Sequence, residues 1–216
     1  DYIAPQIYWE IGGRQDYDKL SNWWAEKSNH RHVVIGQALY KMSQGERPWP
    51  AIEITNQIKL NQKNSKIKGS IFFRAIDIVN NINGIRDSLQ NHYYKNHALI
   101  PVMGWLDSIP LRSPYNLRAL NCSEGVFLQW QNPTIAIDND LAKYNVIYRF
   151  ENGEEIDTTA GENIVGVIPA NLSAFIDSSG IPNKTYTYLV TALDKVQNES
   201  GVSNVVSVKY SQIQIY

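Results

Sequence analysis

The chain has 216 residues, a length that fits one large domain or two modest ones. Its formal net charge is −1 at pH 7, so composition gives no reason to expect nucleic acid or an anionic membrane as a partner. Hydrophobic residues make up 43% of the chain, yet no apolar run approaches the roughly 20 residues of a membrane span. We therefore expect a globular chain with a core.

The chain opens on an apolar stretch, Asp1 to Trp9, which predicts a strand buried on both faces. Such strands belong to parallel sheets covered by helices, and ligands bind beyond the carboxyl ends of the strands. Gln6, Tyr8 and Trp9 are therefore expected at a ligand-binding edge. Because Asp1 begins within a strand and without an initiator methionine, we expect a piece cut from a longer precursor.

The following hundred residues alternate between helical and strand patterns. The expected elements are a helix over 17–28, a strand over 32–41, a helix over 51–64, a strand over 68–74 and a helix over 84–94. Gln37, Tyr40 and Lys41 fall at the end of the second strand, and Arg74 falls at the end of the third. Three parallel strands are too few to close a barrel, which needs about eight.

From residue 97 the chain is apolar and interrupted by prolines, and residues 97–113 are expected to form a stiff connection packed on its neighbours. Short β-rich runs separated by turns then predict an all-β sandwich over 114–216. The expected strands cover 116–121, 126–130, 143–150, 173–177, 186–193 and 203–210. In the strand that begins at Tyr186, alternate residues are expected to face inward, which leaves Leu189 and Thr191 facing out.

Residues 114–216 resemble a fibronectin type III domain. The resemblance rests on Leu128-x-Trp130-x-x-Pro133, on Tyr144-x-Val146-x-Tyr148 and on Tyr186-x-Tyr188-x-Val190-x-Ala192-x-Asp194 followed by Asn198-Glu199-Ser200. It implies that Trp130 is the buried tryptophan of the second strand and that Tyr186 is the tyrosine-corner residue. No recognisable ligand motif lies between the strands, which favours a structural spacer over a partner-binding domain.

Residues 1–96 resemble the carboxyl-terminal part of the bacterial glycosyl hydrolase-like family 10. The blocks that carry the resemblance are Asp1 to Trp9, Leu20-x-x-Trp23-Trp24-Ala25, Ile35-Gly36-x-Ala38-x-Tyr40-Lys41 and Gly69-Ser70-Ile71-x-Phe73-Arg74. The resemblance implies strands six to eight of a (β/α)8 barrel that acts on peptidoglycan or a related glycan. The expected fold is thus α/β followed by all-β, a partial barrel joined to a sandwich.

Hydrolysis of a glycosidic bond usually needs two carboxylates roughly 5 to 9.5 Å apart. Glu10 is the only carboxylate at a strand end in this sequence, and the resemblance implies that the acidic cluster of the family lies on strand four. Glu10 also fits a solvated loop position, so we do not assign it as catalytic. We therefore expect this chain alone to have no glycosidase activity.

The other strand-end residues are expected to contact substrate. Tyr8, Trp9 and Tyr40 would stack on sugar rings, and hydrogen bonds to hydroxyl or carboxylate groups would come from Gln6, Gln37, Lys41 and Arg74. No metal or other cofactor is expected, because His30 and His32 lack a further ligand at usable spacing. The single cysteine, Cys122, is expected to be a small core residue.

Three functions stay open at this point. The chain is part of a glycoside hydrolase, or a non-catalytic glycan-binding module, or an adhesion or scaffold protein in which the β-sandwich carries the function. Asp or Glu residues at strand ends upstream of this chain would favour the glycoside hydrolase. The resemblance implies an exported parent, periplasmic or at the cell surface. The open sheet edges and the expected barrel interior of Ile3, Ile35, Ala38 and Ile71 predict self-association.

Overall fold

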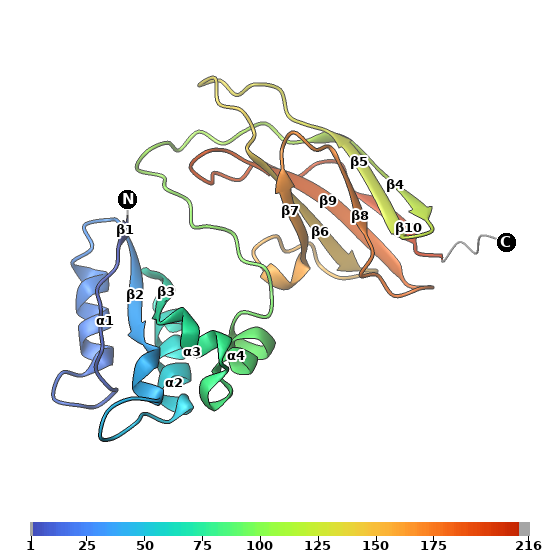
Figure 1. The fold of residues 1–216 in the computed structure, drawn as a ribbon. Helices are drawn as coiled ribbons and strands as arrows, with labels where there is room; N and C mark the ends of the chain where they lie inside the picture. Colours follow the sequence, from blue (N-terminus) through green and yellow to red (C-terminus); the bar gives the residue numbers. More distant parts are fainter. Residues whose placement is uncertain (1, 212–216) are drawn as a thin grey trace. The chain divides into compact units, whose positions relative to one another are not determined.

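A computed structural model describes residues 2–211 of the chain, which is rich in sheet and has few helices. The chain forms two compact units, residues 1–95 and residues 96–216 (Figure 1). None of the helices in the described range is long and apolar enough to cross a lipid bilayer.

Unit 1 contains a three-stranded parallel sheet of β1 (Tyr2–Ile3), β2 (His32–Ala38) and β3 (Ile67–Phe73), in the order β1-β2-β3. The pairing of the first segment with β2 resumes at an isolated bridge between Gln6 and Gly36. A Cβ atom at Gly36 would lie only 3.2 Å from Gln6 Cα, so glycine at this position allows the two backbones to approach closely.

Helices α1 (Tyr17–Glu26) and α2 (Ala51–Lys63) lie against this sheet (Figure 1). Asp16 caps α1, because its carboxylate accepts a hydrogen bond from the backbone N–H of Asp18. The core between α1 and the sheet is formed by Ile7, Tyr17, Ala25, Val33, Ile35 and Ile67, with Ile3 packed against it. The sequence-based assignment of Ile3 and Ile35 to a barrel interior is therefore wrong, since both side chains pack on the helix side.

Two predicted elements of unit 1 are shorter than expected. The strand predicted over 32–41 ends at Ala38, where the 3-10 turn η1 (Leu39–Met42) begins. The helix predicted over 84–94 is present over residues 85–93, as α4 (Ile85–Ser88) followed directly by the π-helix η3 (Leu89–Tyr93). Two unpredicted elements precede it, α3 (Ala75–Val79) and the 3-10 turn η2 (Ile82–Gly84). The positive φ values of Asn81, Asn83 and Gly84 prevent α3 and α4 from joining into one helix.

Unit 2 is built from two antiparallel sheets, ordered β4-β5-β8 and β10-β9-β6-β7 (Figure 1). The strands are β4 (Tyr115–Cys122), β5 (Gly125–Gln131), β6 (Tyr144–Glu151), β7 (Ile164–Pro169), β8 (Ala174–Asp177), β9 (Thr185–Leu193) and β10 (Val206–Lys209), and a short 3-10 turn, η4 (Gly161–Asn163), precedes β7. The sequence did not predict β7, because Gly166 and Pro169 weaken the strand pattern.

The two sheets share one core. Its buried members are Leu117, Val126, Leu128, Trp130, Ile147, Tyr186, Tyr188, Val190 and Tyr210. The hydroxyl of Tyr186 accepts a hydrogen bond from the backbone N–H of Ile181 at 2.9 Å, which closes the corner before β9. Cys122 is only half-buried at the end of β4, so its assignment to the core is wrong.

The second face of the β10-β9-β6-β7 sheet is also partly covered. Leu189 and Thr191 were expected to face out, but both are buried. Leu99 in the connection before β4 packs on a cluster that contains Leu189, Tyr148 and Ile164. A chain segment that strand alternation cannot reveal therefore covers this face, and the outward assignment of these two residues is wrong.

Candidate functional site

Three aromatic rings meet in unit 1. The centroid of the Tyr40 ring lies 6.0 Å from that of Tyr8 and 6.0 Å from that of Phe73, and both pairs meet edge to face. The rings of Tyr8 and Phe73 are near parallel, with centroids 6.2 Å apart. Burial and then the neighbouring Tyr40 raise the pKa of the Tyr8 hydroxyl above its ordinary value. We call Tyr8, Tyr40 and Phe73 the aromatic cluster.

The sheet itself brings these rings together. In parallel strands the carboxyl ends meet at one edge, and alternate side chains point to opposite faces. Ile7 and Phe72 pack on the helix side, so Tyr8 and Phe73, the next residues along, point to the other face. Phe73 is 52% exposed. The sequence analysis named Tyr8 and Tyr40 but missed Phe73, which the alternation of Ile71 with Phe73 signals.

Two basic residues of the predicted site have partners within the unit. Lys41 Nζ donates a hydrogen bond to the backbone oxygen of Tyr8 at 2.5 Å and lies 4.8 Å from the centroid of the Trp49 ring. Arg74 Nε lies 3.4 Å from Asp77 Oδ2. Lys41 therefore fixes the end of the first strand segment, and Arg74 pairs with a nearly buried carboxylate.

Gln37 lies apart from the aromatic cluster. Its side chain is fully buried on the helix side, where Nε2 donates to Gln57 Oε1 at 3.3 Å. Gln57 Nε2 in turn donates to the backbone oxygen of Trp9 at 3.2 Å and to Glu53 Oε1 at 2.8 Å. Glu53 Oε1 also accepts from the backbone N–H of Ile11 at 2.8 Å. Gln37 thus supports the loop after the first strand segment, and the sequence analysis missed Glu53 and Gln57.

The remaining predicted residues lie on or beside this loop. Gln6 continues the pairing with β2, and Trp9 is 39% exposed. Glu10 is exposed, and its backbone oxygen accepts hydrogen bonds from the backbone N–H groups of Gly13 and Tyr17. The structure therefore brings Tyr8 and Tyr40 into one cluster and leaves Glu10 in the turn that precedes α1.

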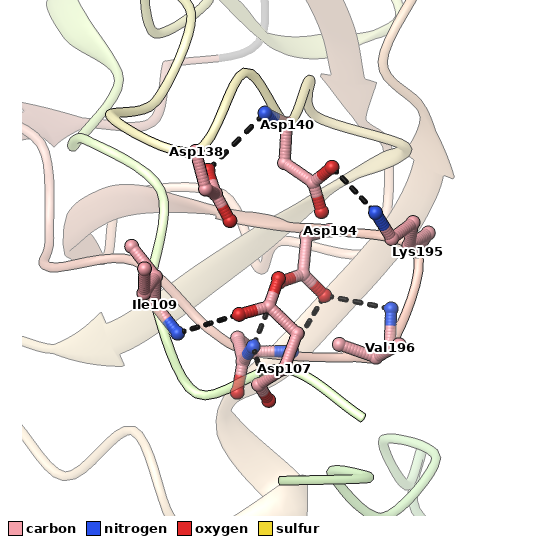
Figure 2. Close-up of polar contacts among 8 residues, drawn as sticks. Asp107, Ile109, Asp138, Asp140, Asp194, Lys195 and Val196 are labelled. Carbon is pink, nitrogen blue, oxygen red and sulfur yellow. Dashed lines mark hydrogen bonds and ion pairs between the residues drawn. The ribbon is translucent and has the colours of Figure 1, made fainter. Parts of the chain in front are cut away.

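A separate group of carboxylates in unit 2 could hold a cation. Asp107, Asp140 and Asp194 each contribute an oxygen, and these oxygens lie within 4.8 Å of one another (Figure 2). Lys195 Nζ lies 2.6 Å from Asp140 Oδ1 and supplies one positive charge. The sequence analysis considered only histidines as metal ligands, and it missed this group because its members come from three separate loops.

Backbone groups hold two of these carboxylates. The N–H of Val196 donates to Asp194 Oδ1 at 2.8 Å, and the N–H of Ile109 donates to Asp107 Oδ1 at 2.9 Å (Figure 2). The hydrogen bond from Ile109 is the main cause that lowers the pKa of Asp107 below its ordinary value. Backbone N–H groups of the loops therefore fix the positions of the Asp107 and Asp194 carboxylates.

In sequence the chain is similar to known glycosyl hydrolases. It is 36% identical over 208 residues to the glycosyl hydrolase YngK of Bacillus subtilis, an alignment that covers 94% of this chain and 40% of YngK. The chain is glycosyl hydrolase-like. It is also 37% identical over 84 residues to the glycosyl hydrolase DigH of Escherichia coli K12, which covers 34% of this chain and 19% of DigH. The chain thus spans well under half the length of these relatives, and no family model matches it.

Two solved structures are similar to about half of the chain. A β-1,2-glucanase from Parabacteroides distasonis aligns with a TM-score of 0.39 and 27% identity, over 50% of this chain and 14% of the glucanase. A fibronectin type III-like protein from Clostridium thermocellum aligns with a TM-score of 0.37 and 18% identity, over 50% of this chain and 100% of that protein.

Proposed function

We propose that the chain is the carboxyl-terminal part of a glycoside hydrolase of glycosyl hydrolase-like family 10, and that unit 1 supplies the glycan-contacting end of its barrel. The observation that carries this proposal is the aromatic cluster at the carboxyl ends of parallel strands, in a chain similar over 94% of its length to YngK. Ligands of such sheets bind at this edge, and exposed aromatic faces suit the apolar faces of sugar rings.

In this proposal, β1, β2 and β3 are strands six to eight of a (β/α)8 barrel, and unit 2 is a fibronectin type III domain. The parallel order of the three strands supports the first assignment. The buried Trp130 and the hydrogen bond that Tyr186 accepts from Ile181 support the second. The glycan is the bacterial cell-wall glycan or a related polysaccharide, and the parent protein is exported to the periplasm or the cell surface.

The first prediction is that the 216-residue chain binds cell-wall glycan without cleaving it. A glycosidase needs two positioned carboxylates, whereas Glu10 is exposed in a turn and Glu53 is engaged by Ile11 and Gln57. Co-sedimentation with insoluble peptidoglycan measures binding, and release of reducing ends measures cleavage. Absence of binding would contradict the proposal for unit 1, and robust release of reducing ends would contradict the inactivity.

A second candidate function is a glycan-binding module in a parent that lacks catalytic carboxylates. The aromatic cluster of unit 1 favours it over an adhesion role of unit 2, since Glu10 is exposed in the turn that precedes α1. The two candidates differ in the complete parent protein, which releases reducing ends only if it is a hydrolase.

A second prediction concerns self-association of the chain through unit 1. β1 and β3 are the edges of the sheet, so their outer N–H and C=O groups lack strand partners within the described residues. Ile71 and Phe73 on β3 are also 43% and 52% exposed. We expect a second copy to pair with this edge, which sedimentation velocity would detect as a concentration-dependent dimer. A monomer at all concentrations, with strong amide-exchange protection throughout β3, would contradict the prediction.

A further inference from the structure

Unit 2 contains a pocket on the face of the β10-β9-β6-β7 sheet that Leu99 partly covers. The pocket has a volume of about 400 Å³, which lies within the range of about 300 to 1,000 Å³ typical of small-molecule sites. It is lined by His97, Ala98, Leu99, Thr158, Thr159, Gly161, Ile164 and Glu199. The backbone at Gly161 and His97 is in close contact, since a Cβ atom at Gly161 would lie 2.3 Å from His97 O.

Glu199 is the acidic group of this pocket, which His97 also lines, and its carboxylate is held in place. The hydroxyl of Tyr148 and the hydroxyl of Thr191 both donate to Glu199 Oε1, each at 2.6 Å. Burial of the Tyr148 ring, together with the hydrogen bond to Glu199 and its charge, raises the pKa of that tyrosine, so its hydroxyl stays a donor at neutral pH. The orientation of Glu199 is therefore set before any ligand arrives.

The charge of Glu199 has no counterion in the described residues. The ion pairs formed within residues 2–211 involve other carboxylates, and both hydrogen bonds to Glu199 come from neutral hydroxyls onto a single oxygen. Oε2 accepts no hydrogen bond there and is not among the buried polar atoms without a partner, so it is open to solvent. A carboxylate oxygen of this kind accepts most strongly from a cationic donor.

We propose that this pocket binds a primary ammonium group carried on a small apolar or sugar-ring body, with Glu199 as the counterion. Leu99 and Ile164 belong to the apolar cluster beside Tyr148 and would cover the carbon face of such a ligand. Thr158 and Thr159 also line the pocket. A threonine hydroxyl can accept an N–H hydrogen bond, and that of Thr159 already donates to Asp157 Oδ1 at 2.6 Å. The site lies wholly within residues 96–216 and does not rest on the proposed glycan contact of unit 1.

The decisive variant is Glu199→Gln, because glutamine keeps an oxygen acceptor for Tyr148 and Thr191 but removes the charge. The probes are n-butylammonium and glucosamine, which present the same ammonium on an alkyl chain and on a sugar. Amide resonances of the full chain are followed by NMR during titration at neutral pH. We expect saturable shifts around Glu199 in the unaltered chain and a loss of affinity of about tenfold or more in Glu199→Gln.

Neutral probes and a matched variant complete the experiment. n-Butanol and N-acetylglucosamine share the bodies of the two probes but lack the cation, and Glu155→Gln removes an exposed carboxylate that does not line the pocket. The neutral probes should bind at least tenfold more weakly, and Glu155→Gln should bind as the unaltered chain does. Three results would each overturn the proposal: equal binding of the neutral and the charged probes, unchanged binding in Glu199→Gln, or no saturable shift with either amine. The comparison of charged with neutral probes needs no substitution, so it remains a test even if the variant misfolds.

Discussion

Replacing Asp177 by alanine is expected to destabilise unit 2 by about 3 to 5 kcal/mol, the usual cost of removing one partner from a buried ion pair. The side chain of Asp177 is only 2% exposed, and Arg149 Nη1 lies 2.8 Å from its Oδ2. The buried hydroxyl of Tyr188 donates to the same oxygen at 2.8 Å, and Ser179 Oγ donates to Oδ1 at 2.6 Å. The substitution would leave the guanidinium and a buried hydroxyl without their acceptor.

The same carboxylate gives the stability of unit 2 a pH dependence. Burial raises the pKa of Asp177, but the hydrogen bonds from Ser179 and Tyr188 and the charge of Arg149 outweigh it and hold the pKa below the ordinary value. A lowered folded-state pKa contributes stability above the unfolded pKa, about 3.9, and this contribution is lost as pH falls through the folded pKa. Unit 2 should therefore lose stability below about pH 4, and Asp177→Asn should flatten that part of the profile.

Asp157 provides a matched control for Asp177. Its Oδ1 accepts from the backbone N–H and the hydroxyl of Thr159 at 2.8 and 2.6 Å, as Asp177 does from Ser179. Asp157 is exposed, however, and forms no ion pair with an arginine within residues 2–211. Amide hydrogen exchange of β9 in the full chain reports the stability of unit 2 alone. Asp177→Ala should increase exchange throughout β9, whereas Asp157→Ala should not. Similar small effects of the two variants would show that the Arg149–Asp177 pair contributes little.

Much of the fold could be predicted because its strands follow simple patterns. Apolar runs located β2 and β3, and period-two alternation located β9 with Tyr186 and Tyr188 facing the core. These sequence patterns gave wrong predictions where tertiary contacts determine burial and strand formation. Leu189 is buried because the distant Leu99 segment packs on its face, and β7 forms from a sequence weakened by Gly166 because it pairs with β6. Local patterns do not encode either contact.

In the candidate site, too, the sequence pattern predicts some residue positions, whereas others depend on tertiary packing. The position of Tyr8 and Tyr40 at strand ends could be predicted, since parallel strands end at one edge. The direction of Gln37 could not, because it depends on which face of β2 meets the helices, and the buried Gln57 fixes that side. The alternation of Ile71 with Phe73 indicates the face of β3 that carries Phe73, but its contacts with the rings of Tyr8 and Tyr40 depend on the packing of three chain segments.

Replacing Tyr40 by alanine is expected to weaken binding of cell-wall glycan by unit 1 by about tenfold or more, which corresponds to about 1.4 kcal/mol. Tyr40 contacts both other rings of the aromatic cluster, so its removal takes away one ring of the proposed glycan contact and frees Tyr8 and Phe73 to move. Tyr40→Phe keeps the ring and its edge-to-face contacts, and it should bind nearly as the unaltered chain does. Co-sedimentation of the full chain with peptidoglycan gives the affinities.

Tyr2 serves as the control for a general effect of losing an aromatic residue from the sheet. It lies at the opposite end of the first strand segment and is 60% exposed, so Tyr2→Ala should leave glycan affinity unchanged. Circular dichroism and amide exchange of β2 establish that each variant is folded under the binding conditions. A folded Tyr40→Ala chain that binds glycan as tightly as the unaltered chain would show that the aromatic cluster only packs unit 1, and the glycan contact would then have to lie elsewhere on the chain.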